Sequence, residues 1–191
     1  MMSNKILALL ENTEALLNGH FLLTSGRHSN MYIEKFRLLE EPNSLDYVCD
    51  KMASIVKTKK VDLVIGAAIG GILIAGGVGR HLNKKHIFSE RVDGKMELKR
   101  GFNINKGDRV VIVEDIITTG GSVRELIQLS EKFGAIIVQI LNLVDRNNKQ
   151  VEFGYPSKAL LHLPSKSWEA SSCPLCDKNI PLTLRGRTGK K

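Results

Sequence analysis

The chain has 191 residues, of which 42% are hydrophobic and 25% are charged, a length and composition typical of one soluble domain with a sizeable core. No apolar run approaches the roughly 20 residues of a membrane span, and the N-terminus lacks the apolar region of a secretory signal, so we expect a cytoplasmic protein with no membrane partner. The formal net charge is +8, but the basic residues are scattered and aromatics make up only 5%. This favours a surface for anionic small substrates over a nucleic-acid platform.

The N-terminal part predicts two helices separated by a hairpin. Apolar residues at helical spacing predict a helix over residues 3–18, with Gly19 as its stop. Apolar runs at 21–23 and 31–33 then flank a polar turn, which predicts a β-hairpin. The turn is either an ordinary surface turn or a lid over an anionic ligand, and its candidate ligand-binding residues are Ser25, Gly26 and Arg27. A second amphipathic helix begins at Pro42 and ends in a basic run at 57–60.

A buried strand is predicted at residues 61–65, followed by a glycine-rich loop and an apolar helix. The loop matches neither a dinucleotide-binding fingerprint nor a P-loop. It can be a tight strand–helix turn, or a cradle for an anion at the end of a parallel strand; we favour the cradle. The residues concerned are Ala67, Ala68, Ile69, Gly70 and Gly71.

Residues 86–91 predict the next strand, and a hairpin around Asp93-Gly94 follows it. The hairpin brings together the cations Arg91, Lys95, Lys99 and Arg100. They form either a solvated edge or a group that closes over pyrophosphate.

Residues 109–122 form the central motif of the chain. An apolar run at 110–113 predicts a buried strand, and two adjacent carboxylates, Glu114 and Asp115, follow it. The next seven residues lead into an amphipathic helix; they are Ile116, Ile117, Thr118, Thr119, Gly120, Gly121 and Ser122. Two carboxylates can accept hydrogen bonds from vicinal ribose hydroxyls, and the loop amides and hydroxyls can surround a phosphate. The motif therefore predicts a site for a phosphorylated sugar.

The C-terminal part predicts a helix that stops at Gly134, an apolar strand at 135–144 and a last strand at 159–163. Arg146 follows the first of these strands. It is a candidate ligand for a carboxylate or phosphate, and its alternative role is a surface ion pair with Asp145.

The C-terminal part also contains Cys173 and Cys176 in a C-P-L-C motif. A structural zinc site usually needs two further ligands, and the sequence has no second pair. His162 could be one partner, but no fourth ligand is evident. We therefore favour a reduced or redox-sensitive thiol pair over zinc.

The run E-D-I-I-T-T-G-G-S resembles the phosphoribosyl pyrophosphate (PRPP) motif of type I phosphoribosyltransferases. Further segments resemble orotate phosphoribosyltransferases, in particular a short-loop bacterial and archaeal subgroup; they are F-L-L-T-S-G-R-H-S-N-M-Y-I, G-A-A-I-G-G, L-K-R-G-F, L-V-D-R and C-P-L-C. The resemblance implies an α/β fold with a central, mainly parallel sheet flanked by helices and a small N-terminal hood. Residues 1–191 would form one domain, with the hood at about 1–40 and 150–184 and the core at about 41–149.

The resemblance also implies a reaction: transfer of the 5-phosphoribosyl group from PRPP to orotate, with Mg²⁺ as cofactor held mainly by PRPP and water, in a homodimer. Glu114 and Asp115 would be catalytic and, with residues 116–122, bind PRPP, whereas residues 67–71 would bind pyrophosphate. Thr118, Arg146 and the turn at 25–27 would bind orotate.

The chain departs from this family at the basic hairpin, which is short and lacks a histidine. Arg91 and Lys95 are the remaining candidates for catalytic contact with pyrophosphate. Thr24 also stands where many relatives carry a lysine, which leaves Arg27 and Arg146 as the cations for orotate. The alternative functions are a phosphoribosyltransferase for a purine or another base, and a PRPP-binding regulator.

Overall fold

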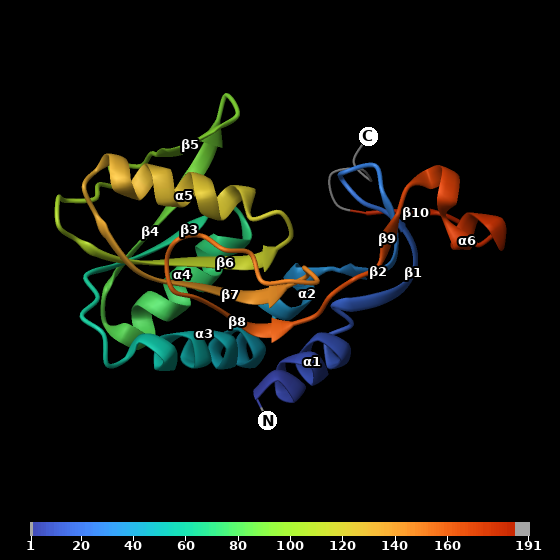
Figure 1. Ribbon diagram of the computed structural model, residues 1–191. Coiled ribbons are helices and arrows are strands. Elements are labelled where there is room, and N and C mark those ends of the chain that lie inside the picture. Colours follow the sequence, from blue (N-terminus) through green and yellow to red (C-terminus); the bar gives the residue numbers. More distant parts are fainter. Residues whose placement is uncertain (1, 186–191) are drawn as a thin grey trace.

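The computed structural model describes residues 2–185 and consists of a large sheet covered by helices and a smaller sheet beside it (Figure 1). The large sheet has six strands in the order β5-β4-β3-β6-β7-β8. Their bounds are Lys95–Leu98 (β5), Lys85–Val92 (β4), Leu63–Ala67 (β3), Arg109–Ile117 (β6), Ile136–Asp145 (β7) and Ser157–His162 (β8). All neighbours in this sheet pair in parallel except β4 and β5, which form the predicted hairpin. The predicted mainly parallel sheet is confirmed.

The helices cover both faces of the large sheet. On one face lie α1 (Met2–Asn12), α2 (Lys35–Leu39), α3 (Pro42–Val56) and α4 (Gly70–Leu82), and on the other lies α5 (Gly121–Lys132) (Figure 1). β6 supplies both hydrophobic cores: Val111 and Val113 pack with the α3 and α4 side, and Val110 and Ile112 pack with the α5 side. This explains why the strand has a continuous apolar sequence.

The connections reverse direction in the middle of this sheet. The unit β3-α4-β4 runs to one side of β3, and the unit β6-α5-β7 runs to the opposite side of β6. β3 and β6 are neighbours, so the carboxyl ends of these two strands flank the point at which the strand order reverses. Ligands of open α/β sheets bind at such a point.

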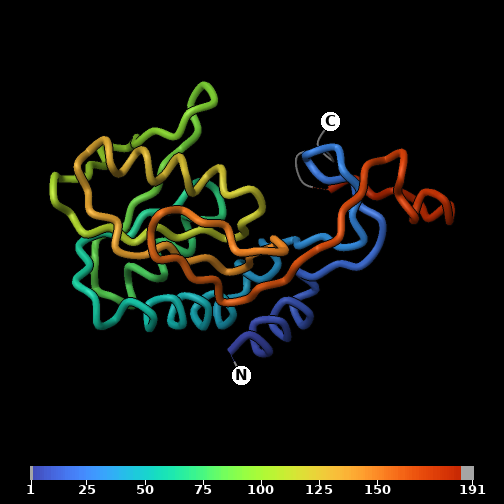
Figure 2. Tube along the Cα trace, in the orientation of Figure 1, coloured from blue at the N-terminus to red at the C-terminus, as the bar shows by residue number. Residues whose placement is uncertain are grey.

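The smaller sheet joins the two ends of the chain and is called the hood here. Its order is β10-β1-β2-β9, with bounds Thr183–Leu184 (β10), Leu16–Leu22 (β1), His28–Ile33 (β2) and Ser167–Trp168 (β9). A one-turn helix, α6 (Pro174–Asp177), lies between β9 and β10. Figure 2 shows the N-terminal hairpin in blue beside the C-terminal segment in orange and red. β8, which falls in the predicted C-terminal part of the hood, instead joins the large sheet.

The predicted helix over residues 3–18 is wrong in its C-terminal half. The helix ends at Asn12, and Leu16 and Leu17 belong to β1. Glu14 has a left-handed conformation with φ 50°, and the Ala15 amide donates to the Leu10 carbonyl at 2.8 Å. These are the features of a helix C-cap, so a residue other than glycine ends the helix before Gly19. Gly19 lies in β1.

Among residues 2–185, no helix has both the length and the apolar character needed to cross a lipid bilayer.

Candidate active site

The loop between β6 and α5 encloses a cavity of about 220 Å³ at the sheet's carboxyl edge. Its lining consists of Arg91, Glu114, Ile116, Ile117, Thr118, Thr119, Gly120, Gly121, Ser122, Val123 and Glu125. Within residues 114–122 of the central motif, every residue except Asp115 lines this cavity. No side chain caps the N-terminus of α5, which begins at Gly121. The first amides of a helix lack intrahelical partners and carry partial positive charge, so this end favours an anion.

Gly120 makes the turn into α5 possible. It has φ 78°, and a Cβ at this position would lie 2.8 Å from the ring of Phe153. Both the left-handed backbone and the close ring exclude other residues there. The glycine therefore fixes the shape of the cavity wall.

The two adjacent carboxylates belong to β6 and are almost completely buried, with 7% of Glu114 and 4% of Asp115 exposed. Glu114 lines the cavity, and burial together with the charge of Asp115 raises its pKa above the ordinary range. Asp115 instead forms an ion pair with Lys35, whose Nζ lies 2.5 Å from Oδ2. Asp115 Oδ1 accepts a hydrogen bond from the Ile116 amide at 2.5 Å.

Lys35 was not identified from the sequence. It begins the five-residue helix α2 after the hood, 80 positions before its partner, and no local motif marks it. Its side chain is 30% exposed, so Lys35 is a cation at the surface that reaches a buried carboxylate of the central motif.

The glycine-rich loop between β3 and α4 packs directly against Asp115. A Cβ built on Gly70 would lie 1.7 Å from Asp115 Oδ2, and one on Gly66 would lie 2.3 Å from the Gly71 carbonyl oxygen. The glycines are therefore required for this close approach. The structure thus places Gly70 against Asp115, although residues 67–71 are not part of the cavity lining.

The two candidate cations of the β4–β5 hairpin, Arg91 and Lys95, lie on opposite faces of it. Arg91 lines the cavity and donates to Glu125 Oε1 at 2.8 Å. Arg91 is paired with Met96, whereas Val92 is paired with Lys95. Successive strand residues point to opposite faces, so Lys95 lies on the hairpin face opposite Arg91 and does not line the cavity. The structure does not bring these two cations together.

Arg146 lies at the junction of core and hood. Its amide donates to the Ile117 carbonyl at 3.0 Å, which brings it next to the cavity loop. Its guanidinium donates to Ser165 Oγ at 2.7 Å, and its Nε is buried without a hydrogen-bond partner. Burial lowers the pKa of this group. No ion pair between Arg146 and Asp145 is found among the described residues. Asp145 Oδ1 instead accepts hydrogen bonds from the Asn147 amide and side chain.

The polar turn at 25–27 lies at the tip of the hood and does not line the cavity. It is closed by a hydrogen bond from the Leu23 amide to the Arg27 carbonyl at 2.8 Å. The Arg27 side chain forms an ion pair with Glu169 and donates to Ser167. Arg27 thus joins the N-terminal hairpin to the C-terminal segment.

The expectation that Cys173 and Cys176 lack two further ligands is wrong. The two sulfurs lie beside His20 and His28, which come from the N-terminal hairpin. His162 is elsewhere, with Nδ1 4.0 Å from Asp145 Oδ2. The two histidines could not be assigned from spacing, since about 150 residues separate them from the cysteines.

The chain matches a known protein family and is similar to named relatives. Residues 37–175 match the family described as "Phosphoribosyl transferase domain". The chain is 41% identical over 190 residues to the orotate phosphoribosyltransferase of Caldicellulosiruptor bescii, covering 100% of both chains. It is 44% identical to that of Chlorobium phaeobacteroides, covering 95% of this chain and 94% of the relative.

A solved structure adds the fold. The crystal structure of orotate phosphoribosyltransferase from Aeropyrum pernix superimposes with a TM-score of 0.70 at 28% identity, covering 85% of this chain and 94% of that one. The sequence match over most of the chain, the type I fold and the cavity formed by the central motif lead to one assignment. The chain belongs to the phosphoribosyltransferase family, in the group of its orotate phosphoribosyltransferase relatives.

Proposed function

We propose that this protein transfers the 5-phosphoribosyl group from PRPP to orotate, giving orotidine 5′-phosphate and pyrophosphate for pyrimidine nucleotide synthesis. The proposal follows from its relatives, which carry that name. The observation that carries it in this chain is the buried, unpartnered Nε of Arg146 beside the cavity loop. An unsatisfied guanidinium N–H favours a ligand with a carboxylate, and orotate has one.

The cavity has the chemistry for the phosphorylated sugar. The N-terminus of α5 and the hydroxyls of Thr118, Thr119 and Ser122 would hold the 5-phosphate. Glu114 would accept a hydrogen bond from a ribose hydroxyl inside the cavity. Asp115 lies outside the cavity lining, beside Gly70, where Lys35 keeps it paired, and it would accept from a ribose hydroxyl on that side. The loop at 67–71 would meet the pyrophosphate from the neighbouring strand end.

In the reaction, the bond between C1 and the pyrophosphate oxygen breaks, a bond from C1 to N1 of orotate forms, and N1 loses its proton to water or to the leaving pyrophosphate. Negative charge grows on the leaving pyrophosphate, and groups that stabilise it there more than in the ground state accelerate the step. Mg²⁺ bound to PRPP oxygens would supply part of this stabilisation. Arg91 is the side chain of the hairpin that lines the cavity, and we assign it to this charge. The homodimer and the cytoplasmic location stay predictions.

The proposal is tested by mixing protein, PRPP and Mg²⁺ with orotate, uracil, adenine or hypoxanthine and measuring pyrophosphate release. We expect turnover with orotate only. Turnover with a purine but not with orotate would contradict the assignment. PRPP binding without turnover for any base would favour a regulator.

Arg146→Ala should raise the KM for orotate roughly 10- to 100-fold, since it removes hydrogen bonds to a charged group. The KM for PRPP should change little. Arg109→Ala is the matched control, because Arg109 begins β6 at the opposite edge of the sheet and donates to the Lys60 carbonyl. Equal effects of Arg146→Ala on both KM values would argue against the assigned role.

A further inference from the structure

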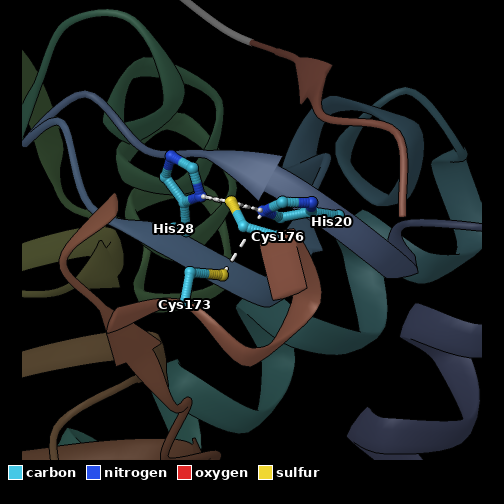
Figure 3. A group of neighbouring side chains, drawn as sticks. All are labelled: His20, His28, Cys173 and Cys176. Carbon is cyan, nitrogen blue, oxygen red and sulfur yellow. Dashed lines mark hydrogen bonds between the residues drawn. The ribbon is translucent and has the colours of Figure 1, made fainter. Parts of the chain in front are cut away.

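Four potential metal ligands converge inside the hood and form what we call the hood cluster: His20, His28, Cys173 and Cys176. One nitrogen or sulfur atom from each lies within 4.8 Å of all the others. Figure 3 shows the four side chains directed toward one another, the histidines from β1 and β2 and the cysteines from the segment that contains α6. The reaction proposed above uses none of them.

The distances suit a tetrahedral ion. His20 Nε2 lies 3.5 Å from Cys173 Sγ and 3.8 Å from Cys176 Sγ, and His28 Nδ1 lies 3.3 Å from Cys176 Sγ. Ligands of a tetrahedral zinc ion, with bonds of about 2.0–2.3 Å, are separated by roughly 3.3–3.8 Å. The two nitrogens are closer, at 2.8 Å, and would separate by about 0.5 Å around an ion.

The His20 ring is oriented from outside the cluster. Its Nδ1 lies 2.8 Å from the Ile180 carbonyl oxygen, and a carbonyl only accepts, so Nδ1 carries the proton. Nε2 therefore presents its lone pair to the other three groups. A ligand histidine that donates its second N–H to a backbone carbonyl is the usual arrangement at zinc sites.

The cluster occupies the place where the hood would otherwise need an apolar core. His20 is 2% exposed, His28 5% and Cys173 1%, and Cys176 lies at the surface. Neither hydrophobic core includes a residue from 17–32 or 164–185. β9 and β10 have only two residues each, and α6 has four. Small units with so little buried apolar surface are typically held by a disulfide or a metal ion.

A metal ion accounts for all four groups, whereas a disulfide accounts for two. A disulfide between Cys173 and Cys176 would join two residues that are only three positions apart. It would leave the two buried histidine side chains unexplained. The donor set of two sulfurs and two imidazoles selects zinc and disfavours Mg²⁺, which prefers oxygen. The site is therefore chemically distinct from a magnesium–PRPP site.

We propose that His20, His28, Cys173 and Cys176 bind one structural zinc ion that joins the C-terminal segment to the N-terminal hairpin. Four protein ligands leave no open position, so the ion has no catalytic role. The turn at 25–27 lies between the two histidines, and Arg27 already contacts Ser167 and Glu169 of the segment that the ion would fasten. This inference does not depend on the proposed substrate.

The first test is metal content. Protein purified without chelators should contain about one zinc ion per chain. Cys173→Ser and His28→Ala should reduce this to background, with Cys49 intact in every variant. His162→Ala is the control that should keep the metal, because His162 lies outside the cluster. Loss of zinc in His162→Ala but not in His28→Ala would overturn the assignment.

A second test uses the unmutated protein, in case the variants do not fold. Cobalt should replace zinc and give the visible bands of a tetrahedral ion with thiolate ligands. Titration of the cysteines with a mercurial should release zinc in step with thiol modification. A reduced protein that binds neither zinc nor cobalt, or a native Cys173–Cys176 disulfide found by mass spectrometry, would overturn the proposal.

Hydrogen exchange locates the effect of the ion. Removal of zinc should accelerate exchange in residues 17–32 and 164–185, and should leave β6 and β7 unchanged, since these strands belong to the other sheet. Unchanged exchange in the hood after zinc removal would show that the ion does not hold these segments together, and would overturn its structural role.

Discussion

Glu114 combines burial with a neighbouring negative charge, and both raise its pKa. The folded protein therefore holds a proton that the unfolded chain releases once the pH rises above about 4.5, the ordinary value. The free energy of unfolding decreases as the pH rises through this interval, and the loss is complete above the raised pKa. Ionised Glu114 therefore lowers the stability of the folded protein, and it also provides a hydrogen-bond acceptor at the cavity.

Glu114→Gln should remove this pH dependence. We expect a higher Tm than the unmutated protein at about pH 8, by roughly 2–8 °C for 1–2 kcal/mol, and no difference below about pH 4. Binding of PRPP should weaken in the same variant. Thermal unfolding across this pH range measures the first effect and calorimetry the second.

Glu11→Gln is the control, because Glu11 is exposed on α1; its Tm should follow the unmutated protein at every pH. A Tm difference for Glu114→Gln that is constant across the pH range would contradict the account of Glu114.

The N-terminus of α4 is the element whose position depends most on glycine. Gly70→Ala places a methyl group where Asp115 Oδ2 lies, at 1.7 Å, so the helix or the carboxylate must move. We expect a loss of about 1–3 kcal/mol in stability and weaker PRPP binding. Thermal unfolding and calorimetry measure the two effects.

The same helix offers a matched control. A Cβ on Gly76 would meet its nearest atom, His86 Cδ2, at 3.9 Å, which is ordinary contact. Gly76→Ala should therefore stabilise the protein by up to about 1 kcal/mol through helix propensity and leave PRPP binding unchanged. Similar destabilisation by both substitutions would contradict the packing argument for Gly70.

Elements built from contiguous residues were predictable. The apolar run at 110–113 and the glycines at 120–121 fixed the β6–α5 unit, because strand, loop and helix follow within one short segment. The first helix was predicted too long, since leucines at 16 and 17 continue its period and a left-handed Glu14 carries no sequence signal. Here the local conformation of one residue outweighed the periodicity.

At the scale of the whole molecule, contacts between distant segments were not predictable. The Lys35–Asp115 ion pair and the hood cluster join residues 80 or more positions apart. One side of each contact lies in a motif, but its partners come from the N-terminal part of the chain and carry no sequence signal of their own. Arg91 and Lys95 lie on opposite faces of the hairpin because of the register in which β4 pairs with β5.

The homodimer stays a prediction, and two exposed apolar residues are candidates for its interface. Phe36 of α2 is 37% exposed and Leu73 of α4 is 42% exposed, on two helices that contact each other. In the predicted homodimer, a second copy of the chain would cover these side chains. In such an assembly a cation that points away from its own cavity can serve the cavity of its partner.

Lys95 is such a cation, and mixing of two variants tests it. Lys95→Ala and Asp115→Asn should each have low activity alone. If Lys95 serves the partner's cavity, a heterodimer of the two has one complete site, and an equal mixture with random exchange should recover roughly a quarter of the unmutated activity. Arg91→Ala mixed with Asp115→Asn is the control: Arg91 lines its own cavity, so neither site of that heterodimer is complete and no activity should return. Recovered activity in the control mixture, or no recovered activity in the mixture with Lys95→Ala, would contradict the assignment of Lys95 to the partner's cavity and of Arg91 to its own.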